Sequence, residues 1–256
     1  MITTGWKMTM NGSVSSVWRG FGDSEIGVLH QRFGLPNQDA YFLDLKSCPL
    51  KIALSDGLGS KTLSHLGAQA VTRSVKRIAD HYANGIETDP LLLISLFHEF
   101  WLEEIHAVNI DQYRCTALFA IVWEEQTLIA QLGDGDCCII TSRQDRSKPN
   151  IRFLTQKDDD LFANQTYSLG PKLQPSQWQF CVEPTAELEA CFLVTDGIDD
   201  DLDPELKTNF YLELLSQYQK LSDDQVVSDV RRWISQWPVA GHSDDRTIVA
   251  LFRQYL

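Results

Sequence analysis

The order of its apolar segments is the feature that most constrains how this chain folds. Short runs rich in β-branched and aromatic residues come before and after a first pair of segments with helical spacing. A second such helical pair follows, and one last β-rich run nearly ends the chain. The predicted strands are residues 14–21, 40–45, 51–55, 115–123, 127–132, 137–141, 151–154, 190–195 and 247–252. Because strands and helices do not alternate one by one, the order predicts an α+β fold with mostly antiparallel sheets.

Three of the four predicted helices carry recognisable start signals. The first covers residues 64–82, and the second begins at Asp89-Pro90, where Asp can cap the helix and Pro suits its first turn. The third begins at Asp203-Pro204. The fourth begins at Ser222, which has Gln225 at the spacing of a capping box. The three β-rich runs between residues 115 and 141 are joined by tight connections and predict an antiparallel meander.

The domain organisation follows from what the chain lacks. No internal repeat and no long linker rich in Pro, Gly or Ser interrupts the 256 residues. We therefore expect residues 1–256 to form a single domain, with a core at about 14–252. The segment at about 155–189 is polar and has few periodic signals, so we expect it to form a surface flap over the core.

Net charge and cysteine content limit the kinds of binding partner and the cellular compartment that we expect. The net charge of −13 argues against nucleic acid and anionic membranes as partners, because binding either requires clustered Lys and Arg. The six cysteines include no C-x-x-C pair, so we expect no structural zinc and a reducing compartment. No apolar run approaches the roughly 20 residues of a membrane span, and no signal peptide is evident. We expect a cytoplasmic protein.

Acidic residues stand at the ends of the predicted strands. The clusters are Asn37-Gln38-Asp39, Ser55-Asp56-Gly57, Gly133-Asp134-Gly135-Asp136, Thr195-Asp196-Gly197 and Asp244-Asp245. Each alone is typical of a turn, because Asp bonds to its own backbone and Gly accepts positive φ. Together they can converge at one sheet edge, where crowded carboxylates repel unless a cation neutralises them. Ligands that are all oxygen favour Mg²⁺ or Mn²⁺ over zinc. The sequence therefore predicts a hard-metal site.

The ordered set of motifs resembles that of the metal-dependent type 2C Ser/Thr protein phosphatases, the PPM family. The motifs are Asn37-Gln38-Asp39-Ala40, Asp56-Gly57-Leu58-Gly59-Ser60, Cys115-Thr116-Ala117, Gly133-Asp134-Gly135, Thr195-Asp196-Gly197 and Asp244-Asp245-Arg246-Thr247. The resemblance spans about residues 20–252, and the Gly27-x-x-His30 motif is most similar to a compact bacterial branch. It implies a four-layer α-β-β-α sandwich, in which helix pairs flank two mostly antiparallel sheets.

The resemblance also implies two bound Mg²⁺ or Mn²⁺ ions. Asp56 would bridge the two ions, and the Gly57 carbonyl would bind the second. Asp196 and Asp244 would complete the first site. In such a centre, water activated between the ions hydrolyses phosphoserine and phosphothreonine in proteins.

Two further residues complete the metal set that the resemblance implies. Asp39 would serve the second ion, directly or through water, and Asp134 would hold a third, weaker ion together with Asp196. An enzyme of this kind would act in signalling on phosphoproteins, opposite a cognate Ser/Thr kinase. We expect it to be a monomer.

Two positions depart from the family pattern. Leu58 stands where many relatives have a His that can protonate the leaving group, and Gly34 stands where many have a phosphate-binding Arg. The candidates for these roles are His30 and His242 as proton donors, and Arg32, Lys61 and Arg246 as phosphate contacts. For each candidate, a local structural contact is the alternative interpretation.

The two departures keep a second function open. A catalytically silent member of the family would act as a metal-dependent phosphoprotein-binding or regulatory module. This chain retains Asp39, Asp56, Asp196 and Asp244, which favours the enzyme, since a binding module does not require the complete metal set.

A nucleotide-binding P-loop at residues 56–62 is disfavoured, because Ser60 replaces the Gly that should precede Lys61.

Overall fold

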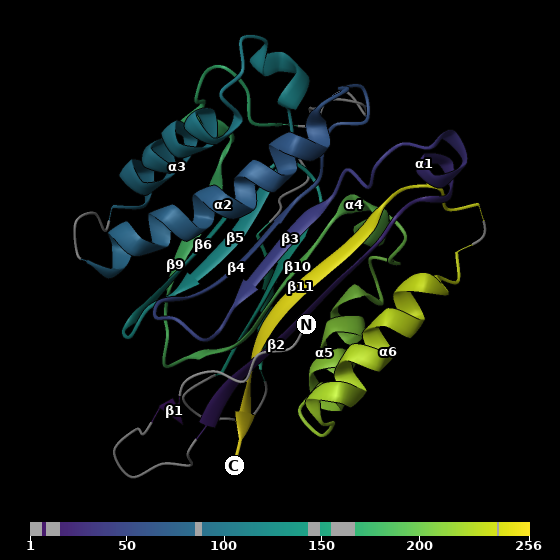
Figure 1. Cartoon of the computed structure of the whole chain (residues 1–256). Helices are drawn as coiled ribbons and strands as arrows, with labels where there is room; N and C mark the ends of the chain where they lie inside the picture. The colour runs from purple at the N-terminus through teal and green to yellow at the C-terminus, as the bar shows by residue number, and fades with distance from the viewer. Residues whose placement is uncertain (1–6, 9–15, 85–88, 143–148, 155–166, 240) are drawn as a thin grey trace.

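Two antiparallel sheets lie face to face at the centre of the molecule (Figure 1). The computed structural model describes residues 7–8, 16–84, 89–142, 149–154, 167–239 and 241–256. In order across the first sheet, the strands are β1 (Lys7–Met8), β2 (Ser16–Glu25), β11 (Arg246–Tyr255), β10 (Leu188–Val194), β7 (Asp136–Thr141) and β8 (Asn150–Phe153). The second sheet contains β3 (Ala40–Asp44), β4 (Leu50–Ser55), β5 (Ala117–Val122), β6 (Gln126–Leu132) and β9 (Gln179–Pro184).

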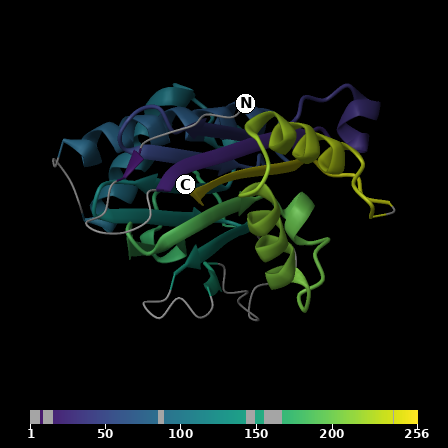
Figure 2. The same ribbon diagram turned by 90° about the horizontal axis from the view of Figure 1, so that it is seen from below.

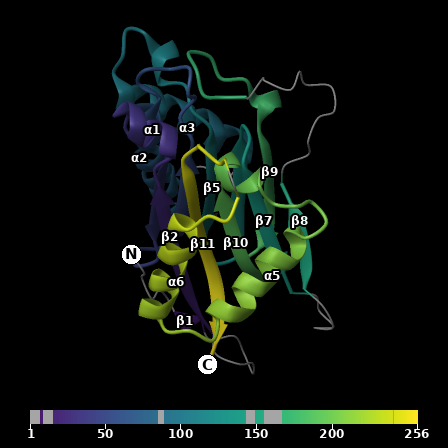
Figure 3. The ribbon, with the colours of Figure 1, turned by 90° about the vertical axis from the view of Figure 1, so that its right-hand side faces the viewer.

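Helix pairs cover the two outer faces and complete a four-layer sandwich. Helices α2 (Ser64–Ala83) and α3 (Pro90–Ile105) cover the second sheet, and α5 (Lys207–Tyr218) and α6 (Asp223–Ser235) cover the first (Figures 1 and 3). Seen from below, the two pairs lie on opposite sides of the sheets (Figure 2). The shorter elements are α1 (Val28–Phe33), α4 (Asp196–Asp199) and the 3₁₀ turns Ile110–Tyr113 and Pro175–Gln177. The predicted α+β sandwich is confirmed.

Apolar residues fill all three spaces between the four layers. In β5, alternate residues face the α2–α3 layer, while the residues between them face the other sheet. The first set is Ala117, Phe119 and Ile121, and the second is Leu118, Ala120 and Val122. Because both faces of the central strands are buried, their sequences are continuous apolar runs rather than alternating ones. No helix in the described ranges is both long and apolar enough to span a membrane.

The predicted helix starts are confirmed at two of the three caps. The Asp89 side chain accepts a hydrogen bond from the Leu91 amide, and Ser222 and Gln225 form the reciprocal capping box. Helix α5 instead begins four residues after Asp203. The Asp203 side chain accepts the Glu205 amide, so this residue closes a turn ahead of the helix rather than capping it.

The predicted antiparallel meander is wrong for its third strand, residues 137–141. Strands β5 and β6 pair with each other, but β7 pairs with β8 and β10 in the other sheet. Gly133 and Gly135, with φ of 98° and 82°, form the turn that carries the chain across. Hydrophobic periodicity predicts a strand but does not say which sheet it joins, so the crossing was invisible to local pattern. It places Asp134 between the two sheets.

The segment predicted as a flap contains regular structure at its end. Strand β9 forms the edge of the second sheet, where Phe180 and Val182 remain 36% and 40% exposed. An edge strand with one exposed face has a weak apolar signal, which explains why the sequence pattern did not indicate it. Residues 155–166 of the predicted flap and residues 14 and 15 of the first predicted strand lie outside the described residues.

A buried ion cluster joins α5 to the end of the sandwich that carries the acidic turns. The Lys207 Nζ atom lies 2.7 Å from Asp136 on β7 and 2.5 Å from Asp199 on α4. The Asp136 side chain is fully buried and that of Asp199 is 5% exposed. Burial alone would lower the pKa of Lys207, but the two carboxylates outweigh it and raise that pKa. Lys207 is therefore the charged partner that permits two buried carboxylates.

Replacing Lys207 with Met should destabilise the protein by about 3–5 kcal/mol, because it leaves buried carboxylates without a counter-charge. Urea unfolding followed by circular dichroism measures the change. The matched control is Arg73→Met, which breaks the exposed Arg73–Glu104 pair and should change stability by less than about 1 kcal/mol. A Lys207→Met variant as stable as the control would contradict the role given to this cluster.

Candidate metal centre

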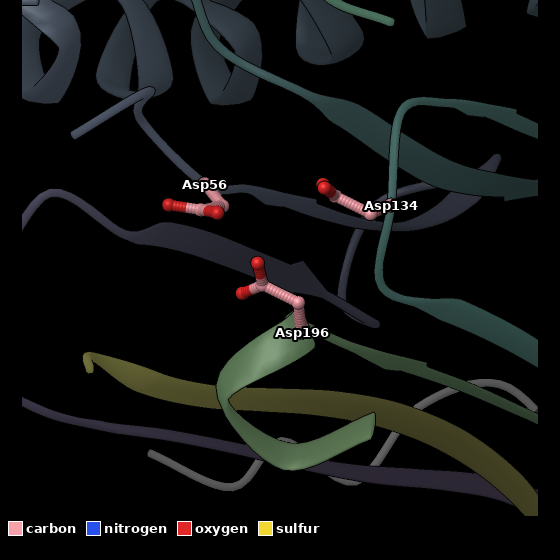
Figure 4. Close-up of side chains that lie close together, drawn as sticks. All are labelled: Asp56, Asp134 and Asp196. Carbon is pink, nitrogen blue, oxygen red and sulfur yellow. The ribbon is translucent and has the colours of Figure 1, made fainter. Parts of the chain in front are cut away.

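Three aspartates from different parts of the chain converge where the two sheets meet. Asp56 follows β4, Asp134 lies in the β6–β7 connection and Asp196 begins α4 after β10. Each offers a carboxylate oxygen within 4.8 Å of the others, and Figure 4 shows the side chains pointing toward a common space. The convergence of acidic turns expected from the sequence therefore occurs for these three residues.

Asp39 lies beside this triad and is held by two threonines. Its Oδ2 atom accepts hydrogen bonds from the hydroxyls of Thr195 at 3.1 Å and Thr247 at 2.6 Å. Its Oδ1 atom is buried, and no N–H donor in the described ranges reaches it. Asp56 lies within hydrogen-bonding reach of Asp39 when one of the two is protonated. An orphaned buried carboxylate oxygen against a second carboxylate is the environment of a metal ligand.

A cavity of about 150 Å³ opens over the triad. It is lined by Gln38, Asp56, Gly57, Leu58, Gly59, Asp134, Asp196 and Asp244. The volume corresponds to roughly five waters at their share of liquid volume, so it has room for cations with part of their hydration shell. Asp244 and Gly57 thus share one cavity with the triad, as the metal prediction requires.

Hydrogen bonds to Thr116 fix the position of Asp56. The Asp56 amide donates to the Thr116 hydroxyl at 2.9 Å, and the Thr116 amide donates to the Asp56 carbonyl at 2.8 Å. The Ser55 hydroxyl donates to the Thr116 carbonyl. The end of β4 is thereby attached to the start of β5, and this gives the Cys115-Thr116-Ala117 motif a physical role.

Asp245 organises the loops around the site, a role that the sequence analysis did not assign. This buried carboxylate accepts the amides of Gly27 and Gln38, each at 2.6 Å, and contacts the His30 Nδ1 atom at 2.9 Å. Its backbone carbonyl also packs on Gly197, where a Cβ would approach to 1.9 Å. The adjacent Asp244 and Asp245 at the start of a strand indicate that one of the two side chains points inward. The sequence pattern does not predict which groups that side chain binds.

The electrostatics of the cluster favour a neutralising charge, a proton or a cation. Burial raises the pKa of Asp196, and the charges of Asp134 and Asp244 raise it further. Burial likewise raises the pKa of Asp56, followed by the charges of Asp39 and Asp196. The ionised cluster is therefore unfavourable by itself. Because its side-chain donors are all oxygen, the residues present fit Mg²⁺ or Mn²⁺.

The residues predicted to handle the proton and the phosphate are not among those that line the cavity. His30 contacts Asp245 through Nδ1. Arg32 is exposed on α1 and forms no ion pair within the described part of the chain. Lys61 pairs with Asp111. Their roles stay predictions.

His242 and Arg246 make local structural contacts instead. The His242 Nδ1 atom lies 2.6 Å from Asp201, and its Nε2 atom lies 3.1 Å from the Asp244 carbonyl oxygen. Arg246 is buried, and its Nε donates to the carbonyl of Ile234. Both nitrogens of His242 are thus occupied, so it has none left to protonate a leaving group.

Solved structures share the fold across nearly their whole length. The catalytic domain of the serine/threonine phosphatase PstP, in complex with two manganese ions, is 16% identical with a TM-score of 0.61, covering 93% of this chain and 99% of that one. PppA of Pseudomonas aeruginosa gives the same four values. A serine-threonine phosphatase 2C from Toxoplasma gondii is 13% identical with a TM-score of 0.61, covering 99% of both chains.

The sequence comparisons identify the family. No curated protein sequence matches the chain. The protein phosphatase 2C family, however, matches residues 26–237, which is most of the sequence and includes four of the five acidic turns. With the acidic site and the shared fold, this match shows that the chain belongs to the protein phosphatase 2C family.

Proposed function

We propose that this protein is a Mg²⁺- or Mn²⁺-dependent phosphatase that hydrolyses phosphoserine and phosphothreonine in proteins. The observation that carries the proposal is the triad of Asp56, Asp134 and Asp196, whose carboxylate oxygens lie within 4.8 Å of one another beside an open cavity. Family membership supports the reaction class. The two manganese ions in PstP support two cations at this site.

The chain's own residues would hold the ions and orient the phosphate. Asp56 would bridge them with the Gly57 carbonyl at the second ion, Asp196 and Asp244 would hold the first, Asp39 would serve the second, and Asp134 with Asp196 would hold a third. When bound, a pair of such cations supplies a hydroxide nucleophile at neutral pH and neutralises phosphate oxygens. Thr195 and Thr247 keep Asp39 oriented, and Thr116 keeps Asp56 in place.

His30 is our proposed proton donor to the leaving group. Asp245 holds its Nδ1 atom, while its Nε2 atom takes part in no hydrogen bond within the described ranges. A carboxylate at one ring nitrogen fixes the tautomer that leaves the other nitrogen to exchange a proton. Arg32 and Lys61 are the proposed phosphate contacts, and Lys61 would have to exchange Asp111 for the substrate.

The partners follow from the proposed reaction. Phosphoproteins would be the substrates, and a cognate Ser/Thr kinase would supply them. Among the structural neighbours, PppA is described as a key regulatory component of a secretion system, which supports a regulatory setting for this fold. We further propose a cytoplasmic monomer that acts in signalling.

The first prediction from the proposed function is Mn²⁺- or Mg²⁺-dependent release of phosphate from p-nitrophenyl phosphate and from phosphoserine peptides. EDTA, Asp196→Asn and Asp244→Asn should each abolish it, because each removes a cation or a ligand that holds one. Steady-state phosphate release measures the activity. Asp224→Asn, at an exposed position of α6, is the matched control and should keep full activity.

Full activity after EDTA treatment or in Asp196→Asn would refute the two-metal mechanism. If Mn²⁺ binds, measured by isothermal titration calorimetry, but no phosphoester is hydrolysed, the silent binding module replaces the enzyme. The two measurements therefore separate metal binding from catalysis.

A second prediction concerns the stability of the metal-free protein. The folded-state pKa of Asp196 is raised from 3.8 to about 8, first by burial and then by neighbouring carboxylates. The folded state therefore binds more protons than the unfolded state, and stability falls as pH rises between these values. In EDTA the melting temperature should be lower at about pH 8 than at about pH 6.

Mn²⁺ should reduce this difference, because the cation replaces the proton as the neutralising charge. Differential scanning fluorimetry measures all four conditions. In Asp196→Asn, the fall in melting temperature between about pH 6 and about pH 8 in EDTA should be smaller than in the wild type. An equal loss in both proteins would show that the carboxylate cluster is not its source.

A further inference from the structure

A second polar cavity lies beside the metal centre and has the opposite charge. It has a volume of about 210 Å³, and its lining includes Arg114, Ser168, Lys172, Gln174 and Gln177. No carboxylate is among the described residues that line it, although the whole chain carries a net charge of −13. A cavity with two cations, a hydroxyl and two amides presents mainly hydrogen-bond donors, which suits an anion.

The two cavities are lined by segments that contact each other. The amide of Leu58, which lines the metal cavity, donates to the carbonyl of Arg114, which lines the basic one. On the other side, Gly133 precedes the metal-site residue Asp134, and a Cβ on Gly133 would lie 2.6 Å from the Tyr167 carbonyl oxygen. Both cavities therefore border the same two loops.

The Arg114 guanidinium is held in place at the wall of the basic cavity. Its Nε atom donates to Asp111 at 2.9 Å, and Nη1 donates to the Ser168 hydroxyl at 3.0 Å. The third nitrogen, Nη2, donates to no acceptor in the described part of the chain. A fixed guanidinium with a spare donor loses little side-chain entropy when it binds a carboxylate or a phosphate.

The charge around this guanidinium is positive overall. Asp111 is shared between Arg114 and Lys61, so one carboxylate balances two cations. Lys172 adds a third positive charge, and it forms no ion pair with any residue that the structure describes. These four groups sum to +2, from three cations and one anion. The patch is an exception on an acidic protein, and it adjoins the place where a phosphorylated chain would be bound.

We propose that this basic cavity binds a second anionic group of the substrate, either a carboxylate or a second phosphate, close to the phosphoserine that reacts. This inference rests on the proposed phosphatase function for the reacting group. Arg114 and Lys172 supply the charge, and Ser168, Gln174 and Gln177 supply neutral hydrogen-bonding groups. The protein would therefore prefer phosphoserines in acidic or multiply phosphorylated segments.

The test compares phosphopeptides that differ only beside the phosphoserine, with Gln, Glu or a second phosphoserine at the neighbouring positions. The readout is the ratio of kcat/KM for each anionic peptide to that for the Gln peptide. The wild type should favour the anionic peptides by about fivefold or more, in line with a partly exposed charge pair, and the ratio should fall at high salt. Comparing the ratio for the Glu peptide with that for the doubly phosphorylated peptide shows whether a carboxylate or a phosphate is preferred.

Lys172→Ala should bring the ratio close to one, and Arg114→Gln should do the same. Lys172 is exposed, so its loss does not disturb the core. Lys76→Ala, which removes an exposed positive charge on α2, is the matched control and should keep the wild-type ratio. An unchanged ratio in Lys172→Ala overturns the proposal. Equal slowing on all peptides and on p-nitrophenyl phosphate also overturns it, because the cavity would then contact the reacting phosphate.

A binding measurement separates this inference from the proposed function. The metal-free protein in EDTA is titrated with inorganic phosphate and followed by amide chemical shifts in the 168–174 segment. Saturable shifts that Lys172→Ala abolishes support the anion site even if no phosphoester is hydrolysed. Hydrolysis without charge preference, together with no Lys172-dependent shift, overturns the anion site while the phosphatase function stands.

Discussion

The mutual repulsion of carboxylates at the junction of the two sheets is the constraint on which the rest of the structure depends. Asp56, Asp134 and Asp196 are held within 4.8 Å of one another, and Asp39 lies against Asp56. Burial and neighbouring charge raise the pKa values of Asp56 and Asp196, so the cluster opposes its own ionisation. A fold that keeps these groups together must hold them by contacts outside the cluster and neutralise part of their charge, with protons or with a cation.

The surrounding hydrogen bonds meet the first requirement. Thr116 holds the backbone at Asp56, two threonine hydroxyls hold Asp39, and the buried Asp245 gathers the loops at Gly27 and Gln38. The Lys207 cluster connects Asp136 and Asp199, which follow metal-site residues on two different elements. These contacts join segments that are far apart in the sequence, and they position Asp39 and Asp56 through protein groups alone. The adjacent cavity, lined by Arg114 and Lys172, places positive charge beside this acidic centre.

The elements of this fold were largely predictable, because helix caps and strand periodicity are local. Ser222 with Gln225 and Asp89 with Pro90 predicted their helices, since a cap needs only a few neighbouring residues. The sheet that β7 joins was not predictable, because Gly133 and Gly135 redirect the chain without altering its periodicity. Strand β9 was missed for a different reason, since an exposed edge strand needs few apolar residues.

The sequence by itself determined the acidic turns, their order and an oxygen-only donor set of the kind that suits a hard cation. It also showed that Leu58 and Gly34 replace two family residues. Only the tertiary structure decided that Asp134 joins Asp56 and Asp196, that both nitrogens of His242 are engaged, and that Arg114 and Lys172 share a cavity. The reason is physical: residue type fixes what an atom can bind, whereas contacts between distant segments arise only when the sheets and helices pack.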